Sequence, residues 1–250
     1  MLNQNLLLTG DDGYNLTKSL RFRSSASAYL NRTPASTPTS WTLSVWVKRG
    51  QLGTTSVIAY SRKAGTDSGG VFFSSGDNLI FDNGFGGYVT TNAVYRDPAA
   101  WSHFVFVWDT TQATASNRMR LYVNGVQVTS FATATYPSQN AVSYVNSNVI
   151  TKIAAFATNG TYYDGYMTNI NFIDGQALAP TAFGAFNSYG VWQPVNYGGS
   201  YGTNGFFLPF TNTSSTTTLG YDFSPAGNNW TCNNISLTAG YTYDSMTDVP

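Results

Sequence analysis

Short apolar runs and two-residue alternation dominate the chain, and both patterns predict β-strands. Residues 101–108 form a run of aromatic and β-branched side chains that is too short for a buried helix and typical of a strand buried on both faces. Residues 118–123 alternate apolar and polar side chains, as a half-buried strand does. Asn124 and Gly125 then tolerate the positive φ of a type I′ turn. The chain should therefore fold back over residues 126–129, which gives three consecutive antiparallel strands.

The same patterns recur on both sides of this stretch. Residues 41–48 place apolar side chains at every odd position, which should face the core, while Trp46 on the other face should pack on a second layer. Two antiparallel sheets packed face to face as a jelly-roll sandwich would accommodate all of these strands. Further strands are predicted at residues 19–23, 55–62, 70–74, 79–81, 88–91, 149–157 and 167–173.

The amino-acid composition strengthens the all-β prediction and argues against nucleic acids and membranes as binding partners. All twelve acidic residues are Asp, helix formers are scarce, and only 10% of the residues are charged. A net charge of zero without a basic cluster argues against nucleic-acid binding. The N-terminal apolar run is too short for membrane insertion. The single cysteine, Cys232, fits folding in a reducing cytosol and is interpreted as an inert small hydrophobic residue.

Changes in residue composition along the sequence divide the chain into three parts. Residues 1–18 are interpreted as an N-terminal arm, and residues 19–180 as the sandwich. Residues 181–250 are rich in Tyr, Gly and Asn and should form a C-terminal extension of strands and loops packed on the sandwich. Its runs at 206–210 and 235–237 are too apolar to remain in water.

Three motifs in order carry a family resemblance: SWTLSVWVKRG at 40–50, the Trp-led strand ending in Asp at 101–109 with the later LYVNG at 121–125, and GYMTNINFIDGQAL at 165–178. They resemble laminin G-like domains of the concanavalin A-like lectin/glucanase superfamily. The opening SLRF, SAYLNRTP and WTLSVWVKRG, with GNNW at 227–230, resembles the form of this domain found in virion proteins of tailed bacteriophages. The resemblance implies a phage structural protein.

Catalysis is tested first because the superfamily contains glucanases. Glycoside hydrolysis generally needs a pair of carboxyl groups, and the glucanases of this superfamily are known for a Glu-x-Asp-x-x-Glu strand. This chain has no Glu, and no predicted strand carries two Asp at alternate positions. His103, the only histidine, has no nucleophile motif to accompany it. We therefore interpret His103 as structural and predict a protein that is not an enzyme.

A calcium ion is the cofactor that the resemblance implies, because many laminin G-like domains carry one on their loop rim. The candidate oxygen ligands are Asp82, Asn83 and Asp164. Asp-Gly and Asn-Gly pairs are also ordinary turn signals. Both interpretations stay open for these residues.

Glycan binding is predicted from aromatic and amide side chains in loops. The loop at residues 159–164 supplies Tyr162 and Tyr163 as stacking groups, and Trp192 in the extension is the second choice. Tyr is equally favoured at protein interfaces and in cross-strand packing, so these alternatives also remain.

These inferences predict a non-enzymatic virion protein, assembled in the host cytoplasm, that forms a fibre, a spike or a capsid decoration. The expected partners are other virion subunits, a homo-oligomer with a trimer favoured, and host-surface polysaccharide. The alternative is a stand-alone carbohydrate-binding module with a rim site formed by calcium or by stacked aromatic side chains. The sequence alone does not distinguish the virion protein from the stand-alone module.

Overall fold

The computed structural model describes residues 14–62, 68–84, 86–156 and 160–250, and these are almost entirely strand and loop. In this part of the chain, no helix is long and apolar enough to cross a membrane. The helical elements are single turns: η2 (Ser24–Ala26), η3 (Ala115–Asn117), η4 (Pro180–Ala182) and α1 (Thr216–Leu219). The strands are β1 (Ser19–Phe22), β2 (Tyr29–Arg32), β3 (Ser40–Arg49), β4 (Ser56–Arg62), β5 (Ser68–Phe73), β6 (Asn78–Asp82), β7 (Tyr88–Val94), β8 (Ser102–Asp109), β9 (Met119–Val123), β10 (Val126–Gln127), β11 (Phe131–Thr135), β12 (Ile150–Ile153), β13 (Gly165–Asp174), β14 (Gly184–Phe186), β15 (Trp192–Pro194), β16 (Phe206–Leu208), β17 (Thr231–Asn233) and β18 (Ser245–Met246).

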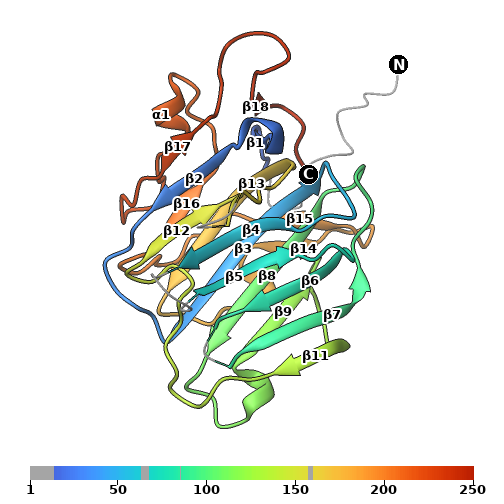
Figure 1. Cartoon of the computed structure of the whole chain (residues 1–250), viewed down its shortest axis with the longest axis vertical. Helices are drawn as coiled ribbons and strands as arrows, with labels where there is room; N and C mark the ends of the chain where they lie inside the picture. The colour runs from blue at the N-terminus through green and yellow to red at the C-terminus, as the bar shows by residue number, and fades with distance from the viewer. Residues whose placement is uncertain (1–13, 63–67, 85, 157–159) are drawn as a thin grey trace.

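Two eight-stranded antiparallel sheets pack face to face (Figure 1). Sheet A has the order β10-β9-β8-β3-β13-β1-β18, with β16 also paired to β13, and sheet B has the order β11-β7-β6-β5-β4-β12-β2-β17. The separate hairpin β14-β15 belongs to neither sheet. This architecture confirms the predicted antiparallel jelly-roll sandwich.

Aromatic side chains fill the space between the two sheets. The Trp41 ring of β3 stacks on Phe172 of β13 with centroids 5.4 Å apart, and it lies at the same distance from Phe81 of sheet B. Phe81 in turn contacts Phe106 edge to face. Burial of these large side chains is the main source of stability.

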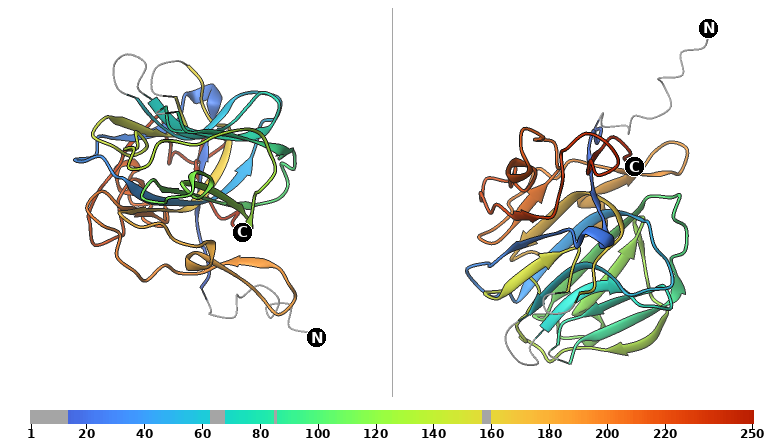
Figure 2. Two further views of the ribbon diagram at one scale, coloured as in Figure 1. Left: turned by 90° about the horizontal axis from the view of Figure 1, so that it is seen from below. Right: turned by 45° about the horizontal axis from the view of Figure 1, so that its top comes forward.

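The outer face of sheet A is buried as well. Val105 and Val107 of β8 lie under a second apolar cluster that includes Phe183 and Tyr201 of the extension. In the left view of Figure 2, the segment around β14 and β15 lies beside the sandwich, and it forms a second layer over the outer face of sheet A. Trp46 is only 3% exposed on this face, which confirms its predicted packing on a second layer.

The predicted three-strand stretch is present as β8, β9 and β10. Asn124 and Gly125 have φ values of 47° and 80°, as the turn requires. The return strand is shorter than the predicted 126–129, since β10 contains two exposed residues at the edge of sheet A. The sequence pattern did not predict β11, which crosses to sheet B and pairs with β7.

The C-terminal residues add strands to both sheets. β16 pairs with β13 at Ile170–Phe172, while β1 pairs with the same edge of β13 at Gly165–Met167. A bulge with Asn169 at φ 50° lies between these two pairings. β17 extends sheet B, and β18 extends sheet A beyond β1. Neither β17 nor β18 was predicted from the sequence.

Asp244 attaches the last residues to β1. Its side chain is fully buried, and its carboxylate accepts hydrogen bonds from Arg21 Nε at 3.2 Å and from Arg23 Nε at 2.7 Å. The Ser236 backbone N–H donates to it at 2.8 Å. The hydrogen bond to Asp244 raises the pKa of Arg23.

Asp244→Asn should therefore destabilise the protein by about 2–4 kcal/mol, because two guanidinium groups lose their carboxylate partner. Urea unfolding measures this change. Asp97→Asn, at an exposed loop position, is the matched control and should change the free energy of unfolding by no more than about 0.5 kcal/mol. Equal effects of the two variants would contradict the anchoring role of Asp244.

Candidate functional site

A groove of about 610 Å³ on the outer side of sheet A is lined by three tryptophans. Trp46 comes from β3, Trp101 directly precedes β8, and Trp192 begins β15. The other walls are residues 14–16, the rest of 191–194, and the last two residues of the chain. Segments distant in sequence thus build one concave aromatic surface.

His103 fixes the position of Trp192 in this groove. The Trp192 Nε1–H group donates to His103 Nδ1 at 3.0 Å, so the proton of the neutral imidazole lies on Nε2 and is donated to Ser44 Oγ at 2.8 Å. The Trp46 ring stacks on the imidazole at 4.9 Å. Burial lowers the pKa of His103 to about 3, so the ring is neutral at physiological pH. Both ring nitrogens serve structure, as the interpretation of His103 as structural requires.

Two glycines make room for the Trp192 indole. A Cβ atom on Gly125 or Gly184 would overlap the Trp192 ring. Gly125 therefore has a second role beyond its turn, which the sequence pattern does not reveal. The ring of Trp192 is 9% exposed.

Trp101 is the half-exposed tryptophan of the groove. Two contacts fix its ring, a hydrogen bond from its indole N–H group and a contact with another aromatic ring. Its Nε1–H group donates to Asp248 Oδ1 at 3.0 Å, while Lys48 Nζ lies 2.8 Å from Asp248 Oδ2. The edge of its ring meets Tyr166. Although burial favours the neutral carboxyl, the hydrogen bonds from Lys48 and Trp101 outweigh it and lower the pKa of Asp248.

Two polar atoms of groove-lining side chains lack a hydrogen-bond partner among the described residues. They are Trp46 Nε1, which can only donate, and Gln193 Oε1, which can only accept. Both atoms are buried, as are the unpaired indole nitrogens of Trp41 and Trp108 in the core, so they do not by themselves mark a ligand site. Sequence analysis missed Trp101 and Gln193 as site residues, since only the fold brings them beside Trp46.

The predicted stacking residues are separated by the structure. Trp192 lies in the groove, whereas Tyr162 lies in a different depression of about 430 Å³ lined mainly by hydroxyl side chains, including Thr55 and Thr161. Tyr163 is fully buried, and its hydroxyl donates to the Lys48 carbonyl at 2.7 Å. A ring without exposed surface cannot stack on a sugar, so the stacking role predicted for Tyr163 is wrong. Residue 159 of that loop lies outside the described residues.

The predicted calcium ligands lie at opposite ends of the sandwich. The loop that follows Asp82 approaches Trp108, which pairs with the first residues of β3. Asp164 lies beside Gly50, just beyond the last residue of β3. Ten residues of strand span about 30 Å. One ion cannot contact both carboxylates.

The individual side chains of this set have protein partners. Asn83 is fully buried, and its Oδ1 accepts from Ser143 Oγ at 2.6 Å. Asp164 Oδ2 accepts from the backbone N–H and the hydroxyl of Ser24. Asp82 Oδ1 accepts from the Gly84 N–H, as a turn residue does, and burial raises its pKa. The described residues contain no cluster of three or more His, Cys, Asp or Glu side chains suited to a metal ion.

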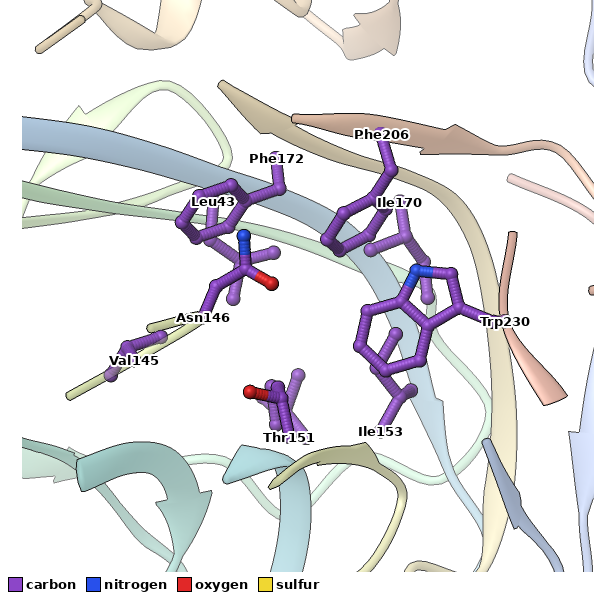
Figure 3. Close-up of a pocket in the computed structure, with 11 residues that line it drawn as sticks. Leu43, Val145, Asn146, Thr151, Ile153, Ile170, Phe172, Phe206 and Trp230 are labelled. Atoms are coloured by element: carbon purple, nitrogen blue, oxygen red, sulfur yellow. The ribbon is translucent and has the colours of Figure 1, made fainter. Parts of the chain in front are cut away.

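A third cavity lies between the sheets and is closed by Leu43, Phe206 and Trp230 among others (Figure 3). Its volume is about 10 Å³, which is room for about one water molecule. Figure 3 shows the Asn146 amide on its wall. This cavity is too small for a sugar and is a packing void of the core.

Solved structures resemble this chain at low sequence identity. A Bacteroides ovatus protein proposed to bind carbohydrate superposes with a TM-score of 0.57 at 14% identity over 88% of this chain, which spans 59% of that protein. The heptameric SAP-like pentraxin of Limulus polyphemus gives 0.46 at 14% identity, over 66% of this chain and 80% of that one. Domains LG4-5 of the mouse laminin α1 chain give 0.45 at 13% identity, over 66% and 43%.

No curated protein matches the chain. A family model described as the concanavalin A-like lectin/glucanases superfamily matches residues 22–182, which contain the three motifs noted in the sequence. This match covers most of the sandwich and ends just before β14. The chain therefore belongs to the concanavalin A-like lectin/glucanase superfamily, as a laminin G-like member.

Proposed function

We propose that this chain is a non-catalytic virion subunit of a tailed bacteriophage that binds host-surface glycan in the tryptophan groove. The observation that carries the glycan binding is the groove of about 610 Å³ lined by Trp46, Trp101 and Trp192. Aromatic faces suit the apolar faces of sugar rings. Neutral sugars need no net charge in such a site.

The absence of catalysis in this proposal rests on the acidic side chains. The sequence has no Glu. Among the described residues, three carboxylates are buried: those of Asp77 and Asp244 are paired with arginines, and that of Asp109 accepts from Thr111 and Gln112. A glycosidase needs one carboxyl group for proton transfer and a second for attack or water activation. Paired structural carboxylates do not supply that combination.

The virion role rests on the phage-type motifs of the sequence and on the surface. Aromatic side chains of the extension reach solvent, with Tyr189 80% exposed and Tyr241 91% exposed. Tyr is favoured at protein interfaces. The partners in this proposal are other virion subunits, through a homotrimer assembled in the host cytoplasm, while a stand-alone glycan-binding module is the alternative.

Trp101→Ala should weaken binding of neutral oligosaccharides about tenfold or more, because it removes the most exposed of the three tryptophans of the groove. Calorimetric titration of a panel of neutral oligosaccharides measures this. Tyr88→Ala, a half-buried aromatic position in sheet B, is the control and should leave binding unchanged. Wild-type protein that binds no glycan of the panel would refute the glycan-binding part of the proposal.

Acidification should destabilise the fold through His103. Its pKa is about 3 in the folded protein and about 6.5 when unfolded, so protons bind the unfolded state preferentially between these values. Its contribution to the free energy of unfolding is complete above pH 6.5 and falls by about 1.4 kcal/mol per pH unit below it. Urea unfolding at pH 7 and pH 4.5 should show a steeper loss for wild type than for His103→Asn. Equal losses would contradict the buried neutral state.

The virion proposal predicts a trimer in solution whose mass is unchanged by a calcium chelator, since the predicted ligands lie at opposite ends of the sandwich. Light scattering with and without chelator measures the mass, and purified particles should be enriched in the protein. A monomer absent from particles would refute the virion role. A monomer that loses thermal stability on chelation would instead support the calcium-dependent module.

A further inference from the structure

The hairpin β14-β15 and the start of β10 expose a cluster of large apolar side chains. We call this cluster the tip patch, and its members, which are between 53% and 80% exposed, are Val126, Phe186, Tyr189 and Val191. Three of the four lie within residues 186–191, at the tip of the hairpin. In the left view of Figure 2 this hairpin, drawn in orange, extends away from the sandwich. Single exposed apolar residues are ordinary, but such a cluster marks an interaction surface.

Trp192 brings the members of the tip patch together. The Phe186 ring meets the Trp192 ring edge to face, with centroids 4.9 Å apart. On another side, the Trp192 ring lies against Gly125, the residue before Val126. The tip of the hairpin therefore lies beside the start of β10, which is the edge strand of sheet A.

Hydrogen bonds within the hairpin fix the backbone at its tip. The Asn187 side-chain oxygen accepts from the backbone N–H groups of Tyr189 at 3.0 Å and Val191 at 2.9 Å. The Asn187 N–H group donates to the Val191 carbonyl at 2.9 Å. A surface held in this way loses little conformational entropy when it binds. At the same time β14 and β15 belong to neither large sheet, and a two-stranded hairpin is only marginally stable by itself. A partner at the tip would complete the burial of the hairpin.

The two segments that form the tip patch carry no charge. Residues 121–151 and 175–221 contain no Asp, Lys, Arg or His, and the chain has no Glu. Charged partners and anionic membrane surfaces require complementary charges, which these segments do not offer. Phe186 and Val191 also have no side-chain groups that could hydrogen-bond to sugar hydroxyls. The surface therefore suits an uncharged apolar protein surface, as the centre of a protein interface usually is.

We propose that the partner is a second copy of this chain, and that the tip patches of the copies meet at the symmetry axis of the homo-oligomer. This inference rests on the proposed homotrimer and names its interface. Every copy carries the same uncharged apolar surface, so a matching surface is present wherever the chain is. Like residues approach one another at a symmetry axis, and charged residues of one sign would repel there. The tip patch brings no charges together.

Light scattering of Phe186→Ser and Tyr189→Ser tests this interface. Each substitution removes apolar surface from the tip patch and should weaken association about tenfold or more, which shifts the mass from trimer towards monomer. Tyr241→Ser is the matched control. Tyr241 is 91% exposed, but its carbonyl accepts from Arg21 of β1, at the edge of sheet A opposite to β10. The control should keep the mass of the trimer, and unchanged circular dichroism of each variant confirms that the fold is intact.

Two charged variants test whether the copies meet through the same residue. Tyr189→Lys and Tyr189→Asp should each be monomeric at low ionic strength, because like charges would face one another at the axis. An equimolar mixture of the two variants should assemble, because opposite charges then meet. A mixture that stays monomeric overturns the contact of the tip patch with its own copies.

The outcomes separate this inference from the proposed function. A wild-type trimer whose mass persists in Phe186→Ser and Tyr189→Ser overturns the tip-patch interface and leaves the homotrimer standing. A wild-type monomer overturns both the interface and the homotrimer. Enrichment of the protein in purified particles then tests the virion role independently of its oligomeric state.

Discussion

The pairing of β3 with β13, with both faces of the pair removed from water, is the constraint on which the rest of the structure depends. One face of β3 meets sheet B through Trp41 and its apolar neighbours. The other face presents Thr42 and Ser44, which need hydrogen-bond partners once buried. The Thr42 hydroxyl donates to the Gln176 carbonyl, and Ser44 pairs with His103. The second layer therefore adds a hydrogen bond as well as apolar cover, because its Trp192 donates to the same His103 ring, which lies on β8 of sheet A.

The candidate site is a consequence of that second layer. It covers the Val105 and Val107 part of sheet A closely, but it leaves the groove beside Trp46 and Trp101. Trp192 closes one wall because a buried neutral histidine accepts a hydrogen bond from its indole N–H group. The aromatic surface offered to a ligand is thus held by interior contacts, so its geometry is set before any ligand arrives.

Much of the sandwich was predictable because the local sequence of each strand shows which of its side chains are buried. The alternation in β3, the apolar run of β8 and the Asn124-Gly125 turn each encode structure over a few residues. The short strands of the extension, β14 to β18, have no such pattern, because two or three residues cannot show a period. Their pairing is decided by the edges that β1, β2 and β13 offer them.

Sequence by itself determined the fold class, the superfamily and the aromatic, weakly charged character of the surface, since these follow from local patterns and composition. The tertiary structure alone decided which of the predicted site residues meet. It buried Tyr163, separated Asp82 from Asp164, and brought Trp101 beside Trp192. The physical reason is that strand patterns fix which face is buried, whereas the contacts between distant loops depend on strand order and register, which no local pattern specifies.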